Sequence, residues 1–101
     1  MGNFHEQLIQ ARFHLTEAEA AELFTLYTNR NTQRTYLDPS LHNPQPLSKD
    51  GWFHRLLATS SSTLKDFVDK GFLKQKPGDG NWYQFESGVE SSLEALLSRM
   101  N

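Results

Sequence analysis

The sequence predicts one domain of the α+β class, mainly helical and completed by a small β-hairpin. Apolar residues recur at helical spacing in several segments on both sides of a proline-rich stretch. Near the C-terminal end, two short apolar and aromatic segments flank the turn-forming residues 77–80. A chain of 101 residues has the size of a single domain with one modest core.

Composition narrows the class of protein. The chain has no cysteine, which excludes disulfides, thiolate catalysis and cysteine-based zinc sites. No apolar run approaches the roughly 20 residues that a membrane span requires. The first residues are polar and lack a signal region, so we expect a cytoplasmic protein without membrane contact. The net charge of −2 is unusual for a nucleic-acid binder, although a local basic patch can exist on a near-neutral protein.

Two helices are predicted in the first thirty residues. Asn3 is a candidate cap for the first, which ends near Phe13. Thr16 and Glu19 have the spacing of a capping box, in which each side chain bonds to the other residue's backbone N–H. The second helix is therefore expected from about residue 17 to residue 29.

Residues 31–48 hold three of the four prolines and few periodic apolar residues. Proline lacks a backbone donor and disfavours helix in the residue before it, so this stretch is predicted as a loop, with at most a short strand at 35–37. The simpler interpretation is an ordered surface loop. The alternative is an insertion that touches a partner or a DNA backbone, for which Arg30 and Arg34 are the candidate residues.

A helix-turn-helix is predicted at 49–71. Ser48 is the expected cap of its first helix, over 49–58, with an inward face that contains Trp52, Phe53, Leu56 and Leu57. Trp52 is interpreted as a core anchor rather than a platform for base stacking. The second helix, over 61–70, has apolar residues at i, i+3 and i+4, and Gly71 ends it.

The last two elements are a hairpin and a helix. Strands are expected at 72–76 and 81–85, and Ser87 and Glu90 are predicted to form a second capping box. The final helix carries an apolar stripe that either packs on its own domain or forms a dimer interface; dimerisation is preferred because so small a chain has little surface to cover it. The stripe consists of Val89, Leu93, Leu96, Leu97 and Met100.

A helix-turn-helix followed by a hairpin is the layout of a winged helix. Residues 61–73 (SSTLKDFVDKGFL) resemble the recognition helix of winged-helix regulators. Residues 82–85 (WYQF), with the helix that follows to residue 97, resemble the second wing strand and C-terminal helix of MarR-like transcriptional regulators. The likeness covers about residues 15–97. It implies a winged helix-turn-helix with extra N- and C-terminal helices, acting as a homodimer on double-stranded DNA to regulate transcription.

This resemblance divides the chain into six segments. They are an N-terminal helix at 1–14, a core helix at 15–30, the proline-rich loop at 31–48, the helix-turn-helix at 49–71, the wing at 72–86 and the C-terminal helix at 87–101.

The resemblance also assigns residues to a DNA interface. Base edges would be reached from the start of the recognition helix by Ser61, Ser62, Thr63 and Lys65, and phosphates would be held by Lys70, Lys74, Lys76 and Arg55. Two aspartates, Asp66 and Asp69, balance the lysines of that helix, and carboxylates oppose phosphate binding. The alternative function is therefore a winged-helix module for protein interaction, as an adaptor, an inhibitor or a complex subunit.

Motifs for catalysis or metal binding are missing from the sequence. Its four histidines, at 5, 14, 42 and 54, include no i, i+4 pair, and no Gly-x-Ser-x-Gly elbow is present. We therefore expect no enzyme activity, no metal and no cofactor.

Overall fold

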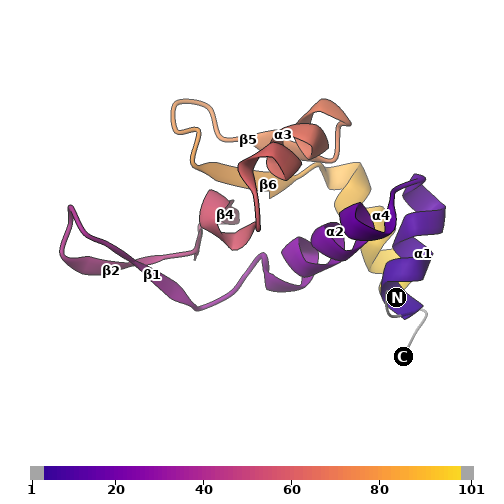
Figure 1. Cartoon of the computed structure of the whole chain (residues 1–101), viewed down its shortest axis with the longest axis horizontal. Coiled ribbons are helices and arrows are strands. Elements are labelled where there is room, and N and C mark those ends of the chain that lie inside the picture. Colours follow the sequence, from indigo (N-terminus) through magenta and orange to yellow (C-terminus); the bar gives the residue numbers. More distant parts are fainter. Residues whose placement is uncertain (1–3, 99–101) are drawn as a thin grey trace.

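The computed structural model describes residues 4–98. Within them the chain forms an α+β protein with four α-helices and two small antiparallel sheets (Figure 1). The predicted fold class is confirmed at this level. The proposed cap Asn3 and the stripe residue Met100 lie outside the described residues.

The first two helices agree with the sequence prediction. They are α1 (Phe4–Phe13) and α2 (Glu17–Asn29), and they pack against each other. The capping box is formed: the Glu19 N–H donates to Thr16 Oγ1 at 3.1 Å, and the Thr16 N–H donates to Glu19 Oε1 at 3.0 Å. Local sequence is therefore sufficient to fix the start of α2.

The proline-rich stretch is not the loop that was predicted. It forms an antiparallel hairpin of β1 (Thr35–Asp38) and β2 (Asn43–Pro46), which we call the arm. The arm is a sheet of its own and projects away from the rest of the domain (Figure 1). Prolines are tolerated in β2 because a two-stranded sheet leaves the outer edge of each strand unpaired. Only the short strand expected at 35–37 was placed correctly.

The second sheet contains β3 (Ser48–Lys49), β4 (Trp52–His54), β5 (Leu73–Gln75) and β6 (Trp82–Phe85) in the order β3-β4-β6-β5. The predicted helix over 49–58 is therefore wrong. Its residues form a tight β-turn, a strand and the single 3₁₀ turn η1 (Arg55–Leu57). Ser48 is a strand residue rather than a cap, and His54 caps η1 through its ring.

The error has a physical reason. The apolar residues of this segment are spaced i, i+1, i+4 and i+5, which is the spacing of the buried face of a helix. In the structure Phe53 instead lies opposite Tyr83 in the β4–β6 ladder. Asp50 and Gly51 adopt φ of 54° and 86°, so the chain reverses between β3 and β4 where a helix would have continued.

The remaining elements follow the prediction. They are α3 (Ser61–Asp69), the β5–β6 hairpin and α4 (Ser87–Ser98). Gly71 has φ of 80° after α3, a conformation that glycine adopts without strain. Ser87 is the first residue of α4 rather than its cap, and the Glu90 carboxylate bonds to Arg30, so the second capping box does not hold as predicted.

The core lies between the helices and one face of the four-stranded sheet. Its largest fully buried side chains come from every helix and from β4, and they are Phe53, Phe67, Ile9, Leu23, Leu26, Leu64 and Leu93. Helices α1, α2 and α4 lie together at the end of the molecule opposite the arm (Figure 1). Helix α3 packs on β5 beside them.

Candidate functional site

Helix α3 begins with a cap that leaves its first residues in solvent. The Ser60 hydroxyl accepts from the Thr63 N–H at 3.2 Å and bonds to Thr63 Oγ1 at 2.8 Å. Thr63 is therefore half-buried and used by the cap, whereas Ser61 and Ser62 are exposed. Lys65, one turn further along, is also exposed. Of the four residues predicted to reach base edges, three lie exposed on the surface of α3, and one of these, Ser62, bonds to the Ser60 hydroxyl at 3.1 Å.

The turn before α3 is fixed from α2. The Glu22 carboxylate accepts from the Thr59 N–H at 2.8 Å and from Thr59 Oγ1 at 3.0 Å. Such bonds to a charged acceptor are stronger than neutral ones. They hold the start of α3 at a defined position on the domain.

Lys70, predicted to hold a phosphate, is exposed but forms an ion pair with another residue of the same domain. Its Nζ donates to Glu19 Oε2 at 2.8 Å, which joins the end of α3 to the start of α2. This bond, together with the bonds to Thr16, lowers the pKa of Glu19 to about 2. The charge that α3 presents to solvent is therefore Lys65 against Asp66 and Asp69, all three exposed.

The two wing lysines lie on the face of the sheet that is directed away from the core. Alternation along β6 buries Tyr83 and Phe85 and leaves Trp82 and Gln84 half-buried on the opposite face. Lys74 pairs with Gln84, so it shares that opposite face. The Lys76 N–H donates to the Trp82 carbonyl, so the pairing with β6 continues one residue beyond the end of β5. By the same alternation, the Lys76 side chain lies on the same face as Lys74.

We call this surface the outer sheet face. Its members are Lys49, Trp52, His54, Lys74, Lys76, Trp82 and Gln84. Gln75, in contrast, lies with Tyr83 and Lys65 in a shallow pocket between α3 and the hairpin. The predicted interface residues are thus divided between two surfaces, the exposed side of α3 and the outer sheet face.

Arg55 occupies a third position, at the end of the sheet near the arm. Its Nε donates to Asn81 Oδ1 at 3.0 Å, and its N–H donates to the Asn81 carbonyl at 2.8 Å. These bonds tie η1 to the start of β6. Arg55 is exposed, but it does not lie beside α3.

His54 joins the arm to the sheet. Its Nδ1 accepts from the Leu56 N–H at 3.2 Å, so Nε2 carries the proton and donates to the Tyr36 hydroxyl at 3.3 Å. The Tyr36 ring also packs on the imidazole, with ring centroids 4.6 Å apart. Burial and, to a lesser degree, the Arg55 charge lower the pKa of His54. The ring is therefore a neutral structural link.

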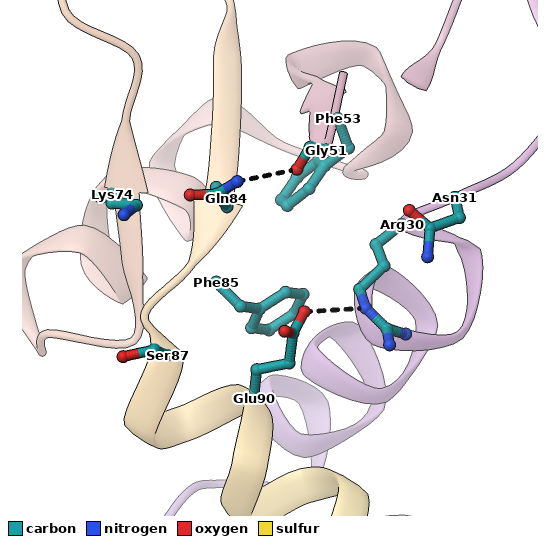
Figure 2. A pocket seen from close by; sticks show the side chains of 9 residues that line it. All are labelled: Arg30, Asn31, Gly51, Phe53, Lys74, Gln84, Phe85, Ser87 and Glu90. Atoms are coloured by element: carbon teal, nitrogen blue, oxygen red, sulfur yellow. Dashed lines mark hydrogen bonds and ion pairs between the residues drawn. The ribbon is translucent and has the colours of Figure 1, made fainter. Parts of the chain in front are cut away.

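A pocket of about 410 Å³ lies between α2, α4 and the sheet (Figure 2). Figure 2 shows Arg30 and Glu90 meeting across it, and their ion pair measures 3.0 Å. Gln84 Nε2 donates to the Gly51 carbonyl at 3.1 Å on the opposite wall. Arg30, predicted as a candidate partner contact, is thus used within the domain, and Arg34 is exposed at the base of the arm.

The stripe of α4 packs on its own domain. Leu93 is fully buried, and Val89, Leu96 and Leu97 pack against the core beside it. Helix α4 contacts α1. This packing accounts for much of the stripe from which a dimer was predicted, and the dimer stays a prediction.

Two tryptophans belong to the candidate surfaces although sequence analysis did not place them there. Trp52 was interpreted as a core anchor, but it is half-buried on the outer sheet face, as is Trp82. The misassigned helix at 49–58 hid this arrangement, because strand register alone brings the two residues to one face. Among residues 4–98 no cluster of three or more His, Asp or Glu side chains is placed to hold a metal ion.

No protein-family model, curated protein or solved structure matches this chain. A search of residues 4–98 for helices of sufficient length and hydrophobicity to cross a bilayer finds none.

Proposed function

We propose that this protein is a winged-helix DNA-binding protein in which α3 enters the major groove and the β5–β6 hairpin acts as the wing. The observation that carries the proposal is the exposed polar start of α3, Ser61 and Ser62. Lys65, one turn further along, lines a pocket together with residues of the β5–β6 hairpin. Short polar side chains and lysine at the start of a helix suit contact with base edges.

The order of the sheet supports the same arrangement. Strand β4 precedes α3 in the chain and pairs with β6, the second strand of the hairpin. This pairing fixes the hairpin next to α3, as a wing requires. The 3₁₀ turn η1 takes the place of the first helix of the helix-turn-helix. By the resemblance to MarR-like regulators, the proposal extends to transcription regulation by a homodimer.

Charge sets the expected strength of binding. The solvent face of α3 has one lysine against two aspartates, because Lys70 is paired with Glu19. Few phosphates are therefore neutralised, and the dependence of affinity on salt should be shallow. Sequence-specific contacts from Ser61 and Ser62 would carry a larger share of the binding free energy.

Fluorescence anisotropy with random duplex DNA tests the proposal. Affinity should fall between about 50 and 200 mM salt, and Lys65→Ala should reduce the salt slope by about 0.9. Arg12→Ala, which removes the same charge from α1, is the matched control and should leave the slope unchanged. Absence of salt-sensitive binding at micromolar protein would overturn the proposal.

The arm supports a second candidate, a module for protein interaction. Leu37 and Leu41 are 68% and 52% exposed on a hairpin that projects into solvent. Exposed apolar side chains on a projecting element are typical of a protein contact. A Leu37→Asp, Leu41→Asp variant separates the functions, because it should retain duplex binding in full if α3 is the DNA-binding element.

A further inference from the structure

We propose that the outer sheet face binds single-stranded nucleic acid, with unpaired bases stacked on Trp52 and Trp82 and phosphates held by Lys49, Lys74 and Lys76. This site is separate from the exposed side of α3 and does not depend on the groove contact proposed above. Both tryptophans of the chain belong to it.

Strand register places the two indoles close together. His54 lies opposite Trp82, so Trp52, two residues earlier on β4, is the diagonal neighbour of Trp82. Diagonal pairs on adjacent strands are about 7–8 Å apart. This separation is about twice the 3.4 Å rise per nucleotide of a stacked strand. The two rings can therefore receive bases two positions apart in a stacked strand, or neighbouring bases of an extended strand.

The platform is held rigidly before any ligand arrives. The rings of Trp82 and His54 pack at 89° to each other, with centroids 5.1 Å apart, and His54 is fixed in turn by Tyr36 and the Leu56 N–H. Both indoles remain half-buried, so part of each ring is open to solvent. A preordered aromatic surface loses little side-chain entropy when a base stacks on it.

Lysines surround the tryptophans. Lys49 on β3 pairs with Trp52 and lies at one edge of the sheet, and Lys74 on β5 lies at the other edge. Lys76 Nζ lies 5.9 Å from the centre of the Trp52 ring. A strand that crosses the sheet would therefore meet an ammonium group on each side of the stacked bases, which is the arrangement that tracks a phosphate backbone.

The charge of the surroundings favours an unpaired strand over a duplex. Carboxylates flank the strands that carry the lysines: Asp50 lies between β3 and β4, Asp79 between β5 and β6, and Glu86 directly after β6. General attraction to phosphate is therefore weak, and stacking must supply most of the affinity. Duplex bases are already stacked on each other, whereas single strands expose base faces to aromatic side chains.

Intrinsic fluorescence gives a direct test because every tryptophan of the chain is in the proposed site. A single-stranded oligonucleotide of about 12 residues should quench the emission, and a duplex of equal length should not. Oligo(dT) and oligo(U) form separate arms that distinguish DNA from RNA. The absence of quenching by either strand, or equal quenching by the duplex, would overturn the proposal.

Variants locate the binding. Trp82→Ala should weaken binding of a labelled single strand about 5- to 150-fold, with Phe4→Ala, an exposed aromatic on α1, as the control. Trp82→Phe keeps a stacking ring and should restore most of the affinity, which separates stacking from misfolding. Equal binding by Trp82→Ala, or equal loss in Trp82→Phe and Trp82→Ala, would contradict the assignment.

The lysines provide an independent measurement. Three phosphate contacts predict a salt slope of about −2 for the single strand, and Lys74→Ala with Lys76→Ala should reduce its magnitude by about 1.4. Lys65→Ala should weaken only the duplex, because Lys65 lies on α3 and outside the outer sheet face. Trp82→Ala should weaken the single strand much more than the duplex, to which the hairpin contributes only as the wing. These variants therefore test duplex binding by α3 and single-strand binding by the outer sheet face separately. An unchanged single-strand salt slope in the double lysine variant would contradict binding at the outer sheet face.

Discussion

The main body of the domain and the β1–β2 arm are held by different kinds of contact. The body has a continuous core to which all four described helices and the larger sheet contribute. No residue of β1 or β2 is buried, and their patterns are only exposed or half-buried. The arm is held to the body by the Tyr36–His54 contact and, just beyond β2, by the backbone bond from the His54 N–H to the Leu47 carbonyl, at 2.8 Å.

The body and the arm are therefore expected to differ in stability. Burial of apolar surface stabilises the body cooperatively. An isolated two-stranded hairpin is marginal in water, so the arm depends on its few contacts at the base. The arm is therefore expected to open by itself at a lower free energy than global unfolding.

A matched pair of leucine substitutions should show the difference most strongly. Leu64→Ala removes a fully buried side chain of α3 and should lower the free energy of unfolding by about 2–5 kcal/mol. Leu37→Ala makes the same chemical change in the arm, where the side chain is 68% exposed, and should change it by less than about 0.5 kcal/mol.

Denaturant unfolding followed by circular dichroism measures both variants. If Leu37→Ala lowered the free energy of unfolding by more than about 1 kcal/mol, the comparison would be wrong, because the Leu37 side chain would then have to be buried against another molecule. Repeating that measurement over a range of protein concentrations would then show whether a second copy supplies the cover.

The body was largely predictable from sequence, and the arm was not. Thr16 with Glu19, the spacing of Leu64 and Phe67, and the turn at 77–80 are local signals that need no information from elsewhere in the chain. The arm has no such pattern. Its position depends on Tyr36 meeting His54 across 18 residues, which periodicity does not encode.

The same limit applies to the candidate surfaces. The exposed start of α3 followed from its polar residues and its apolar spacing. The outer sheet face did not, because Trp52 and Trp82 come together only through the β4–β6 register. A segment whose apolar spacing fits a helix forms a strand and a 3₁₀ turn instead, and the incorrect prediction concealed the face.

Acid should weaken the base of the arm before it affects the body. The pKa of His54 is lowered from 6.5 by burial and then by Arg55, while Asp79 and Asp38 oppose the shift. A lowered histidine pKa means that the unfolded chain binds the proton more readily. The neutral ring therefore contributes its full stability at pH values above about 6.5, the pKa of histidine in the unfolded chain. As pH falls below that value this contribution is lost, by at most about 1.4 kcal/mol per pH unit.

Hydrogen exchange at about pH 5 and about pH 8, corrected for intrinsic rates, should show this loss in the arm amides. Protonation also adds a hydrogen to Nδ1, which then no longer accepts from the Leu56 N–H. His42, exposed in the turn of the arm, is the control, and His42→Gln should leave the pH dependence unchanged. The same dependence in His54→Gln would show that another group is responsible.

Tyr36→Phe should have a smaller and strictly local effect. It removes the hydroxyl that bonds to His54 Nε2 and keeps the ring that packs on the imidazole. We expect a cost of about 0.5–1.5 kcal/mol, seen as faster exchange of the arm amides with an unchanged global midpoint. A shifted midpoint for the whole domain would mean that the arm and the body unfold as one unit.

The smallest effect is expected at a polar contact inside the body, between Glu19 and Lys70. Glu19→Gln keeps an acceptor for the Thr16 N–H and so preserves the capping box, but it removes the ion pair. Because both side chains are partly exposed, the loss should be only about 0.2–1 kcal/mol. The Lys70 bond, together with the bonds to Thr16, lowers the pKa of Glu19 from 4.5 to about 2, so this stability is present above 4.5 and is lost as pH falls toward 2. Glu19→Gln should abolish that part of the acid sensitivity, whereas Glu94→Gln on α4, an equal change of charge, should retain it.

Glu19→Gln also releases Lys70 beside the solvent face of α3, so the salt slope of duplex binding should steepen by up to about 0.9. A steeper slope with little loss of stability would identify the ion pair as a restraint on DNA binding, and an unchanged slope would exclude Lys70 from the interface.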